Sequence, residues 1–167
     1  MKKLIVLVLC LAFLLCGCDQ KAEPFYESTN ELITLTPTYS YYFSDEPYML
    51  CSWNNGTDGY IRFDDVFELQ RLGSGGEWYV VKELGEAEFN TSYCHGIEAH
   101  TESLARYDIE LFAKSMDNGA TYRISTYCYD EDGNYYQVYA EFVCDDDLAE
   151  QELKELSNAA LEGLPEE

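Results

Sequence analysis

The sequence predicts an all-β fold, an antiparallel sandwich or barrel of about seven strands followed by a short C-terminal helix. Segments of strand length, rich in Tyr, Phe, Val, Ile and Thr, recur from Glu31 to Cys144 with turn residues between them. No stretch among them shows the periodicity of a helix. Residues 18–167 are enough for one domain with one hydrophobic core. Regularly spaced strands of this number are typical of a sandwich or a barrel.

The expected strands follow one another along residues 31–144. The clearest turn sequences between them are Asn55-Gly56, the glycine-rich stretch 73–76 and residues 130–134. In the last two strands, alternate residues share a face, and Cys128 and Cys144 fall on the predicted core face. The predicted strands cover residues 32–38, 47–54, 60–72, 78–82, 107–113, 122–129 and 135–144.

The C-terminal segment, residues 145–167, is acidic and differs in pattern. A helix is expected from Asp147 to Glu162, because acidic residues open it, where they suit the helix dipole, and Gly163 and Pro165 follow it. Its apolar stripe is narrow, so the helix is either lightly docked on the β domain or a tail that binds a partner. The stripe consists of Leu153, Leu156, Ala160 and Leu164.

The N-terminus carries an export signal. Lys2 and Lys3 precede an uncharged apolar run, residues 4–15, which as a helix would be roughly 18 Å long and too short for the roughly 30 Å core of a bilayer. Residues 15–18, Leu-Cys-Gly-Cys, resemble the bacterial lipobox. The resemblance implies that residues 1–17 are a cleaved signal peptide and that Cys18 becomes the diacylglyceryl-modified N-terminus. The alternative is an ordinary signal peptide cut elsewhere, but residues 19–23 offer no small-residue cleavage pattern.

These features predict a lipid-anchored protein on the extracytoplasmic face of the cell membrane, which it contacts through the acyl chains on Cys18. Residues 18–30 are polar and contain Pro24, which suggests a tether that lifts the domain off the bilayer. The mature chain keeps 8 of the 10 Lys and Arg residues against 32 Asp and Glu, a formal net charge of −24. Such a charge excludes nucleic acid as a partner and disfavours adsorption to anionic headgroups.

Three segments in order resemble the immunoglobulin-like domains of lipoproteins and secreted proteins in Gram-positive bacteria. They are ITLTPTYSYYFSDEPYMLCSWNNGT, FELQRLGSGGEWYVVKE and ARYDIELFAKSMDNGATYRISTYCYDEDGNYYQVYAEFVC. The resemblance covers residues 31–144. It implies an immunoglobulin-like β-sandwich and an extracytoplasmic location, and it supplies no catalytic residues.

Four cysteines remain after Cys18 and allow two disulfides in three pairings. The register around the turn at Asp132 argues against a bond between Cys128 and Cys144. The immunoglobulin-like resemblance implies a bond between Cys51 and Cys128. The alternative is that all four are reduced and act as small buried hydrophobic residues.

The sequence contains no motif that predicts an enzyme, a cofactor or a metal site. Nucleophile-elbow, zincin and phosphate-loop patterns are missing from the chain. Cys94, His95 and His100 are spaced like metal ligands, but a structural zinc site needs a fourth. Asp130, Asp132 and Asn134 begin like a calcium loop, yet Gly133 stands in the wrong position, which favours a hairpin turn. We therefore expect a non-catalytic protein.

Tyrosine is unusually frequent, with 15 residues and two clusters at positions 39–42 and 127–139. Tyrosine supplies rigid amphipathic contact area in recognition surfaces, but it is also a good strand residue that tolerates partial exposure. The expected function is a non-catalytic binding or interaction domain for an extracytoplasmic protein or glycan. The alternatives are a glycan- or peptide-binding module that uses exposed tyrosines and a purely structural spacer. The candidate binding residues are Tyr127, Tyr129, Tyr135 and Tyr139.

Overall fold

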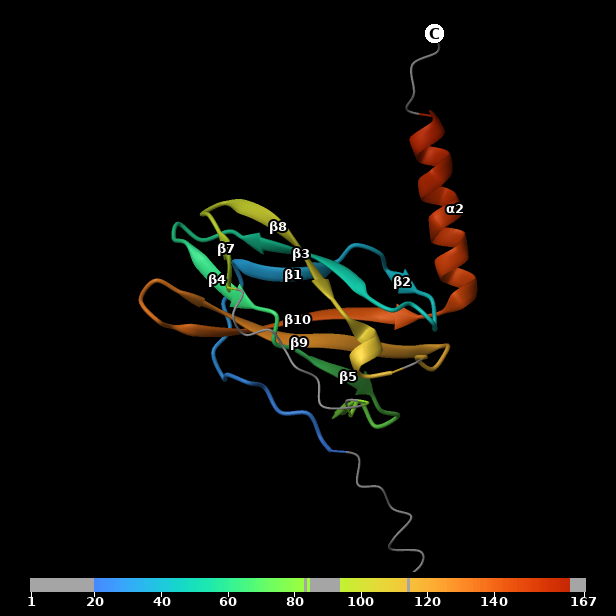
Figure 1. The fold of residues 1–167 in the computed structure, drawn as a ribbon, viewed down its shortest axis with the longest axis horizontal. Coiled ribbons are helices and arrows are strands. Elements are labelled where there is room, and N and C mark those ends of the chain that lie inside the picture. Colours follow the sequence, from blue (N-terminus) through green and yellow to red (C-terminus); the bar gives the residue numbers. More distant parts are fainter. Residues whose placement is uncertain (1–19, 83, 85–93, 114, 163–167) are drawn as a thin grey trace, which may run out of the picture.

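The computed structural model describes residues 20–162 except 83, 85–93 and 114. The described chain forms two β-sheets and a C-terminal helix, α2, that projects from one end (Figure 1). The small sheet has the order β1 (Ile33–Pro37), β3 (Met49–Asn55) and β8 (Thr101–Tyr107). The predicted class, a β-sandwich with a C-terminal helix, is confirmed.

The large sheet is built around two long strands, β9 (Ala120–Asp130) and β10 (Tyr135–Cys144). Short β2 (Tyr41–Tyr42) runs parallel to the end of β10, and the other pairs are antiparallel. On the side away from β10, β9 pairs with two strands, β4 (Ile61–Asp64) and β5 (Glu68–Leu72). Strand β4 also pairs with β7 (Cys94–Ile97), and β5 also pairs with β6 (Trp78–Val80). The neighbours β1-β3-β8 and β10-β9-β4 correspond to the ABE and GFC orders of immunoglobulin domains.

The core lies between the two sheets and follows the two-residue alternation of the strands. Along β3, Met49, Cys51 and Trp53 point inward and are fully buried. Trp53 stacks on Phe63 of the opposite sheet with ring centroids 4.6 Å apart, and its indole N–H donates to the buried Tyr107 hydroxyl at 3.0 Å. The indole therefore joins β3, β4 and β8.

Three parts of the predicted strand pattern differ from the observed one. The expected strand 60–72 is two strands, because the bulge at residues 64–67 lies opposite Thr126 and Tyr127, and the Thr126 hydroxyl donates to the Val66 carbonyl at 2.7 Å. The expected strand 107–113 is the end of β8 followed by the 3₁₀ turn Ile109–Leu111. Residues 94–97, which lie outside the predicted strands, form β7. The described chain therefore has ten strands rather than about seven.

The predicted Asn55-Gly56 hairpin turn is also different in form. Asn55 is the last residue of β3 and is fully buried, and its side-chain amide donates to the carbonyls of Gly59, Ile97 and Glu98. The Gly56 N–H donates to the Leu32 carbonyl at 2.7 Å, and a Cβ at residue 56 would lie 2.9 Å from that oxygen. Glycine is needed at this position for close approach to β1, and not for a positive φ.

Three of the four described cysteines, Cys51, Cys128 and Cys144, are buried, and Cys94 is exposed. The predicted core positions of Cys128 and Cys144 are confirmed. Burial raises the pKa of both Cys51 and Cys128 to about 12, so these thiols are protonated near neutral pH. Cys51 and Cys128 lie on facing sheets, β3 and β9, and both are free thiols here, so the bond between them stays a prediction.

Candidate functional site

The large sheet brings together three of the four predicted tyrosines on its outer face. Tyr127 and Tyr129 of β9 lie beside Tyr135 of β10, with ring centroids 5.9 and 5.3 Å from that of Tyr135. Tyr139 does not join them. Its ring instead packs against the guanidinium of Arg123, whose central carbon lies 4.1 Å from the Tyr139 centroid and 4.2 Å from that of Trp78.

The N-terminal segment, residues 20–30, covers part of this tyrosine cluster. Tyr26 stacks on Tyr135 with centroids 4.5 Å apart, and both Phe25 and Tyr26 pack edge-on against Tyr127. The described part of the predicted tether, the blue segment in Figure 1, is thus attached to the sheet through these ring contacts. Tyr127 and Tyr135 are therefore in contact with this segment.

Backbone hydrogen bonds fix the same segment along its length. The Ala22 N–H donates to the Trp78 carbonyl, and the Val80 N–H donates to the Gln20 carbonyl, so the chain pairs with β6. Further on, the buried Gln137 side chain accepts from the Phe25 and Tyr26 N–H groups at 2.8 and 3.3 Å. The Gln137 amide nitrogen donates in the other direction, to the Ser125 hydroxyl and the Thr126 carbonyl. Sequence reasoning missed this role, because a glutamine within a strand gives no sign of its partner.

Cys94, His95 and His100, the three residues spaced like metal ligands, do not come together in the structure. His95 Nε2 lies 3.0 Å from an oxygen of Asp65, and its ring stacks on Phe63. His100 Nε2 lies 2.9 Å from Asp58, and the Cys94 sulfur lies 3.1 Å from the Tyr129 hydroxyl. Among the described residues no three His, Cys, Asp or Glu side chains are grouped as metal ligands would be.

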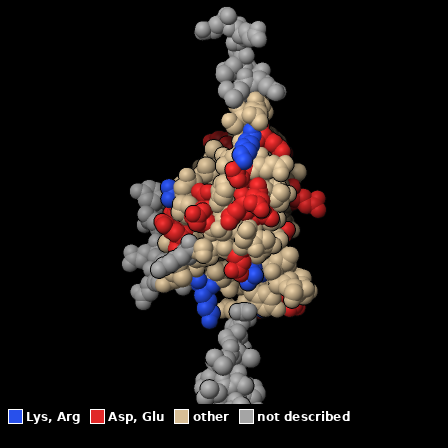
Figure 2. Space-filling model, turned by 90° about the vertical axis from the view of Figure 1, so that its right-hand side faces the viewer, with Lys and Arg blue, Asp and Glu red and all other residues tan. Residues whose placement is uncertain are grey.

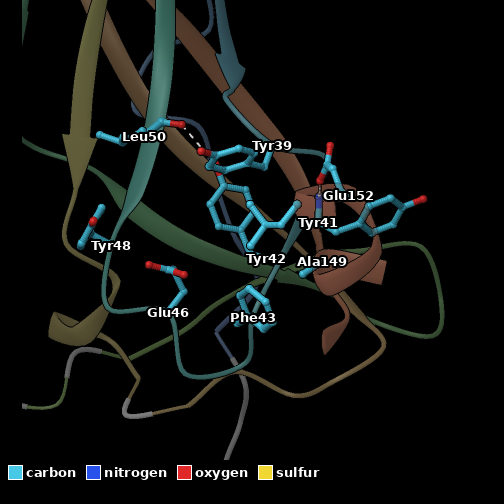
Figure 3. A pocket seen from close by; sticks show the side chains of 10 residues that line it. Tyr39, Tyr41, Tyr42, Phe43, Glu46, Tyr48, Leu50, Ala149 and Glu152 are labelled. Carbon is cyan, nitrogen blue, oxygen red and sulfur yellow. Dashed lines mark hydrogen bonds between the residues drawn. The ribbon is translucent and has the colours of Figure 1, made fainter. Parts of the chain in front are cut away.

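A pocket of about 240 Å³ lies where α2 (Asp146–Glu162) begins, beside the segment 39–50 (Figure 3). Its walls combine aromatic rings with two carboxylates, and no Lys or Arg lines it. The tyrosine cluster at residues 39–42 is visible in the sequence, but nothing in the sequence indicates that it lines a pocket. The lining residues are Tyr39, Tyr41, Tyr42, Phe43, Glu46, Tyr48, Leu50, Ala149, Glu152 and Leu153.

Carboxylates of α2 attach the helix to the pocket wall. The Glu152 carboxylate accepts from the backbone N–H groups of Ser40 and Tyr41, and Asp146 accepts from the Ser44 N–H at 2.6 Å. Ala149 between them is buried. Inside the pocket, the Tyr42 hydroxyl donates to the Leu50 carbonyl at 3.2 Å, and burial raises the pKa of this hydroxyl far above its ordinary value.

Beyond Glu152 the helix stands clear of the sandwich (Figure 1). The Leu153 and Leu156 side chains are 43% and 50% exposed, although both belong to the predicted apolar stripe. The helix is therefore docked only by its first two turns. No helix among the described residues is both long and apolar enough to cross a membrane.

Replacing Glu46 with glutamine is expected to stabilise the protein at pH 7 and to change little at pH 4 or below. Partial burial, with a smaller effect of Asp45, raises the pKa of Glu46 above its unfolded value. The folded state then holds this proton more tightly, so stability falls as the pH rises from the unfolded pKa, about 4.3, through the folded one. Urea unfolding at both pH values measures the effect.

The matched control is Glu131→Gln, which removes the same formal charge from an exposed turn. Equal stabilisation by the two substitutions at pH 7 would mean that net charge, and not burial of Glu46, is responsible.

Comparisons with known proteins find only remote similarity, and only to solved structures. No family model and no curated protein matches it. It is similar to the archaellum periplasmic stator protein FlaG from Sulfolobus acidocaldarius, at 12% identity and a TM-score of 0.38 over 66% of this chain and 100% of that one. The periplasmic stator complex of FlaF and FlaG from the same organism matches at 12% identity and a TM-score of 0.38, over 74% of this chain and 100% of that one. A PapD-like domain of human CEP192 matches at 8% identity and a TM-score of 0.30, over 77% of this chain and 96% of that one.

Proposed function

We propose that the chain is an extracytoplasmic lipoprotein, anchored through Cys18, whose β-sandwich is a non-catalytic binding domain for a protein partner. The observation that carries the proposal is helix α2, which leaves the sandwich with Leu153 and Leu156 uncovered while its base lines an aromatic pocket. Apolar side chains on a projecting helix favour contact with another protein. The lipobox-like residues 15–18 support the anchor.

The docked N-terminal segment supports a particular orientation on the membrane. Gln20 is hydrogen-bonded to Val80, so only Asp19 separates it from Cys18. Two residues span at most about 7 Å, which would hold the β6 side of the domain close to the lipid. In Figure 1 the described chain begins with the blue segment at the bottom of the view, whereas α2 rises at the top. The helix and its pocket would therefore face away from the bilayer.

The alternative of a glycan or peptide site on the tyrosines has less support. Residues 25 and 26 already pack on Tyr127 and Tyr135, and the chain's own Arg123 occupies the face of Tyr139. A ligand would have to displace the N-terminal segment first. A function in binding is better supported at the pocket and α2.

The anchor is tested by the intact mass of protein from the membrane fraction. We expect the mass of residues 18–167 with an added diacylglyceryl group, and we expect a Cys18→Ser variant to lose both the modification and the membrane association. A mass with residue 18 unmodified, in protein that stays soluble after export, would contradict the anchor. That result would not bear on the proposed binding surface at α2 and the pocket.

A further inference from the structure

The pocket and the leucines of α2 form one continuous surface. Leu153 lines the pocket at one end, and Leu156 lies one turn further along the same helix face. From Ala149 to Ala160 this face extends about 17 Å, at 1.5 Å per residue. That length matches about three turns of a second helix packed alongside it.

The charges around this surface are almost all negative. Figure 2, which looks at the side from which α2 rises, shows Asp and Glu side chains gathered across the middle of the face, with few Lys and Arg among them. The only basic residue of the helix, Lys154, is already paired with Glu150 at 2.7 Å. A second copy of this chain would bring two such acidic helices together, and an anionic lipid surface would be repelled. A partner with a basic surface is favoured instead.

The pocket itself has the chemistry of a site for a cationic side chain. Figure 3 shows the Glu46 carboxylate between Tyr48 and Phe43, and all three residues line the pocket together with Tyr42. Rings and a carboxylate together attract a guanidinium or an ammonium group. The chain already uses this contact nearby, because the Arg106 guanidinium carbon lies 4.4 Å from the centroid of the Tyr48 ring. The contact between Arg106 and Tyr48 is thus an example of the cation–π interaction that the pocket offers to a partner's side chain.

We propose that this surface binds a basic amphipathic helix of a partner protein. One Arg or Lys side chain of that helix enters the pocket beside Glu46, its apolar face covers Leu153 and Leu156, and its other cations face the carboxylates of α2. This inference rests on the proposed binding function and names its partner class. The contact area is small, so the complex is expected to be of micromolar affinity and weakened by salt.

The test uses residues 18–167 with Cys18→Ser, so that no acyl chain or detergent competes for an amphipathic probe. The probe is a fluorescein-labelled 16-residue peptide of Leu and Arg in a helical amphipathic order, measured by fluorescence anisotropy. One comparison peptide has the same composition in an order without an apolar face, and another has Glu in place of Arg. We expect the amphipathic Leu and Arg peptide to bind at least tenfold more tightly than the reordered one, and the Glu peptide not to bind.

Variants locate the site. The double substitution Leu153→Ser with Leu156→Ser should weaken binding about tenfold, and Leu104→Ser, on a still more exposed leucine of β8, should not. Glu46→Gln should weaken binding several-fold, and Glu131→Gln should not. Circular dichroism and thermal melts check that each variant is folded.

Three results would overturn the proposal. They are no binding of the amphipathic peptide, equal binding of the reordered one, or equal effects of the site and control substitutions, which would indicate unspecific attraction to an acidic protein. Sedimentation of the protein alone tests whether a second copy of the chain occupies this face instead. A dimer that the leucine substitutions abolish would show that the face is a self-association surface. The anchor is measured separately by mass, so its failure would not be confused with failure of the peptide binding.

Discussion

Replacing Trp53 with alanine is expected to lower the free energy of unfolding by about 3–5 kcal/mol, which for a domain of this size is a large part of the total. Trp53 is fully buried on β3, stacks on Phe63 of the opposite sheet and donates its indole N–H to Tyr107. Alanine removes all of these contacts and leaves a cavity between the sheets. Urea unfolding followed by far-ultraviolet circular dichroism measures the loss without depending on tryptophan fluorescence.

Two further variants separate packing from hydrogen bonding at this position. Tyr107→Phe keeps the ring but leaves the buried indole N–H without its acceptor, at a cost of about 1–3 kcal/mol. Leu104→Ala, on an exposed residue of the neighbouring strand β8, should change stability little. A loss below 1 kcal/mol for Trp53→Ala would show that this contact between the sheets does not hold the sandwich together.

The sequence predicted well those elements that are determined by residues within or next to the element itself. The expected strands 122–129 and 135–144 correspond to β9 and β10, because the alternation of apolar residues and the turn at residues 130–134 lie within one short stretch. The turn itself is closed by Asp130, whose carboxylate accepts from the backbone of Asp132 and Asn134. A hairpin of this kind is visible from its own residues.

Elements that depend on a distant partner were predicted poorly. The break between β4 and β5 depends on Thr126 of β9, and the apolar pattern of residues 60–72 gives no sign of it. Strand β8 was missed because it carries exposed polar residues such as Glu102 and Arg106 on an edge of the small sheet. Its pairing with β3, and not its own composition, makes it a strand.

The candidate sites show the same limit. Tyr127, Tyr129 and Tyr135 were predicted as an exposed binding site, but the nearest aromatic partners of Tyr127 and Tyr135 come from residues 25 and 26, about a hundred positions away in the chain. The pocket needs the 39–50 segment and the start of α2 together, and the hydrogen bonds from Ser40 to Glu152 that join them span 112 residues. A single sequence contains the residues of such a site but not their proximity.

Replacing Gln137 with alanine is expected to release the N-terminal segment and to destabilise the domain by about 2–3 kcal/mol. Gln137 is 3% exposed, accepts from Phe25 and Tyr26, and donates to Ser125. Without it, these buried groups lose their partners and regain hydrogen bonds only if the segment lifts and water enters. Chymotrypsin should then cut after Phe25 or Tyr26 much faster than in the unchanged protein, and the amide protons of both residues should lose protection from exchange.

The matched control is Gln151→Ala, on an exposed glutamine of α2, which should leave stability and cleavage unchanged. For the lipid-anchored form that we propose, the release would have a further consequence. Residues 18–30 would become a free linker that reaches up to about 40 Å when extended, and the domain would no longer be held next to the lipid. Energy transfer from a dye on Cys94, the exposed cysteine, to a lipid-bound acceptor should therefore fall in the Gln137→Ala protein. If cleavage and energy transfer both stay as in the unchanged protein, Gln137 does not hold the segment, and the aromatic packing on Tyr127 and Tyr135 is sufficient to dock it.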